Sequence, residues 1–216
     1  PLVNDTHNRY YWAGDGAPKY NTFNRLLLNQ PEFLLGIPTP TVTPVVTPPG
    51  PGDDTFRSYV YTFVSAYGEE GAPSPPTTVQ AGAAGTWAIT GMQTVVPDAA
   101  QRNVTLKRIY RTVPGNTSTL FYFVAEIPVG DANYNDTFAD DVVALNNTLE
   151  STSYLPPPSD LEGFVVMPNG YLVGWVGRRL LFSEPYRPHA WPAEYEIGIE
   201  FEIVGLAVWG NTLIIG

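Results

Sequence analysis

A dense run of apolar and β-branched residues covers residues 59–67, where tyrosine, valine and phenylalanine occupy both alternating sets of positions. Because successive residues of a strand point to opposite faces of a sheet, a run that is apolar on both faces predicts an interior strand. The next four residues, 68–71, are two glycines around two glutamates and predict a turn. The prolines of residues 73–76 then predict a segment that cannot take a central position in a sheet.

Short apolar runs recur through the following part of the chain, and turn signals separate them. Pro114-Gly115-Asn116 and Gly130-Asp131 are two such signals. Several short strands at this spacing are typical of an antiparallel sandwich. The strands predicted in this part are residues 86–89, 104–111, 120–127 and 134–138.

Residues 38–54, which precede the first strand, hold six prolines interleaved with threonine and valine. The first half of this segment predicts one of two structures. One is a linker in the polyproline conformation, and the other is an edge strand, where missing N–H groups do no harm. The end of the segment, residues 49–54, predicts a loop.

Three consecutive prolines at residues 156–158 mark the clearest domain boundary, and strands punctuated by glycine follow them. Pro168-Asn169-Gly170 predicts a hairpin turn between two of these strands. Consecutive strands of this kind are typical of a propeller blade, although one blade cannot close a propeller. The strands predicted here are residues 163–167, 171–176, 179–183, 194–204 and 206–215. Because the chain starts without methionine and ends on an apolar strand, we expect it to be a fragment.

Residues 1–37 have a different character. Tyr10, Tyr11 and Trp12 precede the turn signal Asp15-Gly16, and the later leucines show no clear period. This stretch is interpreted as an arm that packs on another surface. The predicted chain is therefore all-β, with an arm at 1–37, a sandwich at 38–155 and opening strands of a propeller-like domain at 156–216.

The composition agrees with many short strands and excludes several classes of protein. Hydrophobic residues make up 44% of the 216 residues and charged residues only 15%, whereas intrinsic disorder requires low hydrophobicity and high charge. The 20 glycines and 22 prolines exclude a coiled coil. No unbroken apolar run reaches the roughly 18 residues that a membrane helix requires, so we expect no membrane insertion.

The charge balance narrows the partners. Eleven Lys and Arg against 21 Asp and Glu give a net charge of −10, and binding to nucleic acid usually depends on clustered basic residues. The chain has no cysteine, which excludes disulfides, thiolate metal sites and cysteine nucleophiles.

Several short motifs resemble segments of tailed-bacteriophage virion proteins. Residues 57–74 (RSYVYTFVSAYGEEGAPS) resemble the opening of a fibronectin type III-like domain in these proteins. Residues 107–112 (KRIYRT) and 123–127 (FVAEI) resemble later strands of that domain. Residues 179–185 (RLLFSEP) and 188–192 (PHAWP) resemble the start of the β-propeller in tail-tube and nozzle-like proteins.

The resemblance covers roughly residues 56–216, with a weaker likeness at 7–18. It implies an antiparallel fibronectin/immunoglobulin-like sandwich followed by the opening strands of a β-propeller-like domain. It also implies a structural role in the virion tail, where rings of subunits form the conduit for DNA. The implied partners are other copies in a ring, neighbouring tail or head-tail connector proteins, and DNA that passes through the lumen without specific binding. In one respect the chain departs from ordinary fibronectin domains, because Trp87 lies in a glycine-rich stretch and no early core tryptophan can be placed.

Residues 194–203 alternate between acidic and apolar side chains. On a strand, this alternation places the carboxylates on one face and the apolar side chains on the other. One interpretation is a conduit wall, whose negative lining repels phosphates and lets DNA slide. The other is the solvated outer face of an ordinary strand. The candidate conduit residues are Glu194, Glu196, Glu200 and Glu202.

Basic and aromatic residues are candidates for contacts between subunits, because salt bridges with the many acidic residues fit a ring assembly. Aromatic side chains are frequent anchors of cores and interfaces. They also stack on sugars, so the alternative function is a glycan-binding module on a host-facing phage appendage, with Trp191 as its test residue. The candidate inter-subunit contacts are Trp12, Lys107, Arg111, Arg178 and Trp191.

No residue pattern predicts an enzyme or a cofactor. The two histidines, His7 and His189, have no second histidine nearby, so neither a zinc site nor a Ser-His-Asp triad is supported. The aspartates of residues 131–141 lack the spacing of a calcium loop, and solvated loop charge is the favoured interpretation. Paired acids for glycoside hydrolysis would need a cleft that the pattern does not supply. A remaining hypothesis is an accessory domain of a secreted enzyme.

Overall fold

The computed structural model describes residues 5–114 and 120–216. The chain folds into two compact units. The central unit consists of Pro38–Pro97 and Val104–Thr152, and lies within the range 38–155 predicted for the sandwich. The terminal unit combines the residues up to Ile37 with Asp98–Asn103 and Ser153–Gly216. Both units are built from antiparallel strands, and the described helices are single turns, so the prediction of an all-β protein is confirmed.

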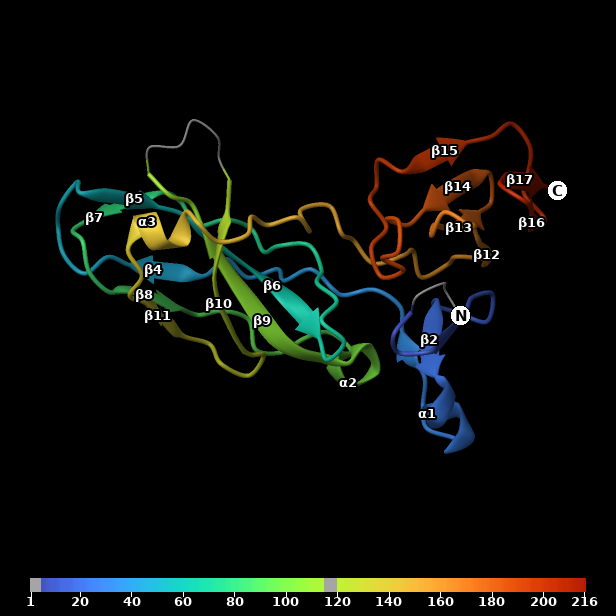
Figure 1. Ribbon diagram of the computed structural model, residues 1–216, viewed down its shortest axis with the longest axis horizontal. Helices are drawn as coiled ribbons and strands as arrows, with labels where there is room; N and C mark the ends of the chain where they lie inside the picture. Colours follow the sequence, from blue (N-terminus) through green and yellow to red (C-terminus); the bar gives the residue numbers. More distant parts are fainter. Residues whose placement is uncertain (1–4, 115–119) are drawn as a thin grey trace. The chain divides into compact units, whose positions relative to one another are not determined.

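The main sheet of the central unit has the order β10-β9-β6 (Figure 1). Its strands are β6 (Tyr59–Ser65), β9 (Val104–Arg111) and β10 (Tyr122–Pro128). Every residue of β6 is buried, as the apolar pattern on both faces predicts. The proline-rich segment after β6 runs back along the outer edge of this strand. Its few N–H groups bond to β6 carbonyls, from Ser74 to Tyr61 at 2.8 Å and from Thr77 to Tyr59 at 3.0 Å.

A second sheet of the central unit has the order β11-β8-β4. It contains β4 (Val45–Thr47), β8 (Trp87–Thr90) and β11 (Tyr134–Asp136). β4 lies between Pro44 and Pro48 at the edge of the sheet, so an edge strand forms within the proline-rich segment. A separate pair joins β5 (Thr55–Arg57) to β7 (Gln80–Gly82), and the short helix α3 (Asp140–Val143) follows β11. The predicted turn at Pro114-Gly115-Asn116 lies partly outside the described residues.

Several aromatic side chains are among the most deeply buried residues of the central unit. Trp87 is fully buried, although its glycine-rich surroundings gave no signal of a core position. Tyr61 is also buried, and its hydroxyl links two loops: it donates to the Val42 carbonyl at 2.8 Å and accepts from the Gln93 N–H at 2.9 Å. Satisfying this buried hydroxyl on both sides removes the cost that an unpaired polar group would carry.

The first part of the terminal unit, predicted to be an arm that packs on another surface, contains a three-stranded sheet. Its strands are β1 (Arg9–Trp12), β2 (Lys19–Thr22) and β3 (Phe33–Leu34), with the order β1-β2-β3. The helix α1 (Phe23–Leu27) follows β2 directly. The short helix α2 (Ala99–Arg102) contacts β3, and its Arg102 donates to the carbonyls of Leu35 and Gly36 at 3.0 Å each. An added Cβ on Gly36 would lie 2.6 Å from Pro156, so residues 36 and 156 pack backbone to backbone.

The second part of the terminal unit is a four-stranded meander with the order β12-β13-β14-β15 (Figure 1). It consists of β12 (Gly163–Val166), β13 (Leu172–Val176), β14 (Arg179–Phe182) and β15 (Glu196–Gly198). The predicted hairpin turn at 168–170 joins β12 to β13, and Gly170 there has a φ of +89°. The sheet is blade-like in strand order, but the described residues contain no closed propeller or barrel. The immunoglobulin-like sandwich and the propeller-like domain stay predictions.

Two strand predictions in this part are wrong. The strand predicted over 194–204 is regular only at Glu196–Gly198, where it pairs with β14, and isolated backbone hydrogen bonds hold the residues on either side. The strand predicted over 206–215 is a hairpin of β16 (Leu206–Trp209) and β17 (Thr212–Ile215). Gly210, with a φ of +57°, turns the chain between them. Leu206 and Leu213 of this hairpin pack on the face of the meander that carries Val173 and Leu180.

Candidate assembly surfaces and a buried ionic cluster

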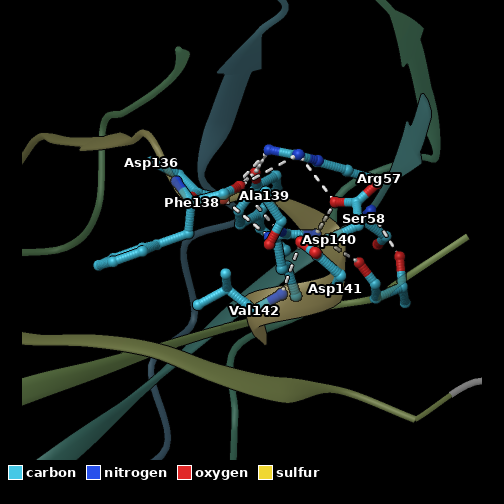
Figure 2. Close-up of polar contacts among 11 residues, drawn as sticks. Arg57, Ser58, Asp136, Phe138, Ala139, Asp140, Asp141 and Val142 are labelled. Carbon is cyan, nitrogen blue, oxygen red and sulfur yellow. Dashed lines mark hydrogen bonds and ion pairs between the residues drawn. The ribbon is translucent and has the colours of Figure 1, made fainter. Parts of the chain in front are cut away.

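Arg57, Arg111, Asp136 and Asp140 form an ionic cluster inside the central unit. Figure 2 shows Arg57 beside the two aspartates. Arg57 of β5 lies 3.3 Å from the Asp136 carboxylate and 2.8 Å from that of Asp140. Arg111 of β9 makes the matching pair of contacts, at 2.8 Å to Asp136 and 2.6 Å to Asp140. The two guanidinium groups and Asp136 are almost fully buried.

Neutral groups complete this cluster. The Tyr59 hydroxyl donates to Asp136 at 2.8 Å, and Arg111 donates to the carbonyls of Phe138 and Ala139 at 3.1 and 3.3 Å. Burial, followed by the nearby Asp136 charge, raises the pKa of Tyr59, so this phenol stays a donor. The charges balance, and the cluster fastens the segment after β11 to β5, β6 and β9. We interpret the cluster as a structural clamp, because both guanidinium groups are bound to carboxylates of the same unit and Arg111 also donates to two of its backbone carbonyls.

Sequence reasoning missed this cluster. Arg57 and Asp136 are almost 80 positions apart, and only the pairing of the strands brings them together. The interpretation of the aspartates at 131–141 as solvated loop charge is wrong for Asp136, which is fully buried. One signal was available in the sequence, because Arg111 lies in a predicted strand on the same face as Ile109. A buried guanidinium requires acidic partners, so this position could have indicated an ionic cluster.

Burial contradicts two of the predicted inter-subunit contacts in the central unit. Lys107 and Arg111 are fully buried, so neither reaches a neighbouring molecule. Lys107 donates to the Asp131 carbonyl at 2.6 Å, and its ammonium lies 5.7 Å from the centre of the Tyr61 ring. Burial lowers the pKa of Lys107 to about 8, against a smaller opposing effect of the Asp131 charge. Both residues serve the core rather than the surface.

The three remaining predicted contacts lie in the terminal unit and differ in exposure. Trp191 is buried, and its indole N–H donates to the Pro188 carbonyl at 2.9 Å. It is therefore unable to contact another subunit or to stack on a sugar, which removes the residue that the glycan-binding alternative named. Trp12 is half-buried on β1. Arg178 is exposed and lies 3.5 Å from Glu202, so it remains available at the surface.

The four predicted conduit residues Glu194, Glu196, Glu200 and Glu202 are all exposed, but only Glu196 belongs to a strand. Two of the four meet arginines of the β13–β14 turn region. Glu196 pairs with Arg179 at 3.2 Å, and Glu202 pairs with Arg178 at 3.5 Å. The apolar side chains between these acids are not all covered, since Ile197 and Phe201 are also exposed. The alternation of acidic and apolar residues in this segment therefore does not correspond to one solvent-exposed face and one buried face.

An apolar hollow of about 400 Å³ lies beside this acidic segment. Exposed Glu194 and Glu196 line it, together with Asn169. Its apolar walls are Met167, Tyr171, Val173, Phe182, Tyr195 and Ile197. Val173, Phe182 and Ile197 come from β13, β14 and β15, so the hollow lies on the same face of the meander that the β16–β17 hairpin covers elsewhere.

The helix α1 presents a second apolar surface on the terminal unit. None of its residues is buried, although Phe23, Leu26 and Leu27 are large hydrophobic side chains. Leu28, which caps the helix, is equally exposed. We call the four side chains Phe23, Leu26, Leu27 and Leu28 the α1 apolar patch. In the sequence this patch is visible only as a run of three leucines. The sequence alone does not show that they are exposed, because that depends on how β2 and β3 pack beside them.

No metal site gathers in the described residues, where no group of three His, Cys, Asp or Glu side chains could hold an ion. No helix among these residues is long and apolar enough to cross a membrane. His189 is buried and packs edge-on against Tyr154, with ring centres 6.2 Å apart.

No protein-family model matches the chain, and no curated protein is significantly similar to it in sequence.

Proposed function

We propose that this chain is a structural subunit of a tailed-bacteriophage virion, forming part of the tail ring through which DNA passes. The subunit acts by oligomeric assembly and not by catalysis. The motifs at residues 57–74 and 179–185 support the class of protein through their resemblance to virion proteins. The central unit serves as a rigid spacer whose buried ionic cluster fixes its strands.

The observation that carries the proposal is the α1 apolar patch. Soluble monomers rarely leave a contiguous patch of large apolar side chains in water, and such patches mark protein–protein contacts. No residue of α1 is buried, and this supports a role for the helix in a surface that a neighbouring subunit covers. Assembly would remove Phe23, Leu26, Leu27 and Leu28 from water together, at roughly 25 cal/mol for each Å² buried.

The exposed carboxylates fit the conduit role in this proposal. Glu194 and Glu200 have no ion-pair partner among the described residues, and the chain carries a net charge of −10. A ring of such subunits would present a negative lining to DNA, which lowers the affinity for phosphate groups. The arginine partners of Glu196 and Glu202 moderate that charge without reversing it.

A cryo-electron microscopy map of the assembled particle tests the proposal. We expect several symmetric copies of the chain around the tail axis, with residues 194–202 facing the channel. A single copy for each particle, or a location away from the axis, would refute the ring. A monomer both in solution and in the particle would refute assembly altogether.

A further inference from the structure

We propose that the α1 apolar patch of one copy of this chain docks in the apolar hollow of a second copy. This inference rests on the proposed function, because it names the surfaces through which the subunits assemble. The terminal unit carries both surfaces, one projecting and one concave, and they share no residue.

The spacing of the exposed side chains on α1 suits insertion into a groove. Phe23, Leu26 and Leu27 stand at positions i, i+3 and i+4, which lie on one face of a helix. Their exposed fractions are 49%, 44% and 69%, so all three are free to enter a partner. Anchors at these spacings are the usual way in which a helix is recognised by an apolar groove.

The segment around α1 is held in place before any partner binds. Thr22 caps the helix, and its hydroxyl accepts from the Arg25 N–H at 3.4 Å. The Arg25 guanidinium donates to Asn21 at 3.0 Å and to the Pro31 carbonyl at 2.7 Å, and it lies 4.2 Å from the centre of the Phe33 ring. These contacts tie both ends of the α1 segment to β2 and β3. Little conformational entropy would therefore be lost at α1 on docking.

The apolar hollow has the size and the lining for such side chains. Its volume of about 400 Å³ is at the lower end of the range of roughly 300–1,000 Å³ that accommodates a small ligand. That volume suits a few large side chains. Val173 forms a buried floor, and the half-buried Phe182 and Tyr171 supply aromatic surface. Ile197, at 54% exposure, gains most from being covered.

The charges around the two surfaces are complementary. Glu194 and Glu196 line the hollow, and Tyr195 is hydrogen-bonded to a further carboxylate, Glu184. Arg179 offsets one of these acids. The α1 helix has no acidic residue in its first turn and carries Arg25 in its last turn. The single positive charge of α1 therefore favours the acidic hollow over a basic surface as its docking site.

Docking of this kind joins two different surfaces. Each copy offers one projecting patch and one hollow, so the contact is heterologous, and repeated heterologous contacts close into a ring or extend as a filament. A two-fold contact between two α1 helices would instead consume one surface and stop at a dimer. The two arrangements therefore differ in which variants abolish association.

Sedimentation velocity of the purified chain over a range of concentrations provides the test, with two variants and two matched controls. Leu27→Asp places a charge on the α1 patch, and Ile197→Asp places one in the hollow. The controls are Leu145→Asp and Val204→Asp, which change exposed apolar residues outside both surfaces. We expect each of the first two variants to weaken self-association at least about tenfold and both controls to associate as the wild type does.

Mixing the two variants gives a sharper result. The Leu27→Asp copy retains an intact hollow, and the Ile197→Asp copy retains an intact α1 patch. An equal mixture should therefore form a heterodimer with wild-type affinity for its single contact, while each variant alone associates at least about tenfold more weakly. Circular dichroism of each variant checks that the fold is unchanged.

The outcomes separate this inference from the proposed function. A wild-type chain that associates, with Ile197→Asp unchanged or with a mixture that stays monomeric, overturns docking in the hollow and leaves assembly intact. A wild-type chain that stays monomeric at every concentration and in the particle overturns the proposed function itself. Loss in both variants with recovery in the mixture supports the inference.

Discussion

The Asp136 carboxylate is fully buried, and it meets two guanidinium groups and a phenol. Asp136→Asn would remove its charge while nearly preserving its shape, and would leave Arg57 and Arg111 with only Asp140 as an acidic partner. Breaking a buried ion pair on one side usually costs about 3–5 kcal/mol. We expect a loss of that size in the free energy of unfolding, measured by urea denaturation. Asp54→Asn, in an exposed loop, is the control and should be neutral; equal losses in both variants would contradict the clamp.

Lys107 gives a pH dependence whose sign can be stated. Burial lowers the pKa of Lys107 to about 8 in the folded chain, whereas the unfolded value is 10.5. Between these values the unfolded chain holds the proton and the folded chain does not, so stability rises with pH. We expect a gain of about 2 kcal/mol between about pH 8 and pH 9.5. Burial also raises the pKa of Tyr59 and Tyr61 above the unfolded value of 10.0. Above about pH 10 the unfolded chain therefore loses phenol protons that the folded chain keeps, and stability should fall.

Urea denaturation at several pH values checks this prediction with two lysine variants. Lys107→Met removes the titrating group and should abolish the rise. Lys19→Met should retain it, because the hydrogen bond to Asp15 raises the pKa of Lys19 and delays its titration. A rise that persists in Lys107→Met would show that another group is responsible.

Residue roles were the least predictable level from the sequence. On a strand, Lys107 and Arg111 share one face with Ile109, and the many acidic residues of the chain favoured both as contacts between subunits. The partners that allow their burial, Asp131, Asp136 and Asp140, lie more than 20 positions away along the chain. The sequence therefore indicated that these residues have polar partners, but the partners lie within the central unit and not on a neighbouring subunit.

At the scale of the element, the pairing of β12 with β13 requires a glycine at position 163, because the Trp175 ring of β13 occupies the space beside it. An added Cβ on Gly163 would overlap the Trp175 side chain on the neighbouring strand β13. Gly163→Ala should therefore lower the free energy of unfolding by about 1–3 kcal/mol, as overpacking does in a filled site. Gly198→Ala in β15 is the matched control, because nothing lies within 4 Å of its Cβ position. Thermal unfolding monitored by circular dichroism compares the two.

The strand predictions were correct where a long apolar run also had a neighbouring strand to pair with along its length. The strand predicted over 104–111 is β9 with the same bounds, and the strand at 59–67 is β6 shortened by two residues. It failed at 194–204, where the pattern is regular but only three residues find a pairing partner. At 206–215 the failure was avoidable, since Gly210-Asn211 is a recognised two-residue hairpin turn.

At the scale of the whole molecule, the chain is divided into two compact units, and such units commonly unfold separately. We expect two transitions in differential scanning calorimetry. Asp136→Asn should lower only the transition of the central unit, and Gly163→Ala only that of the terminal unit. If both variants shift one common transition, the two units unfold cooperatively and the division has no thermodynamic meaning.

The proline-rich segment along β6 has a consequence for how copies of the chain can meet. Pro73, Pro75 and Pro76 have no N–H group, and the N–H groups of Ser74 and Thr77 are already bonded to β6. The outer side of this segment therefore offers few donors to an incoming strand, and the sheet cannot grow in that direction. An exposed strand edge is the usual starting point of aggregation, and here it is blocked by residues that cannot pair. Copies that meet along this side of β6 can therefore recognise one another only through side chains, which discriminate between partners better than an open strand edge does.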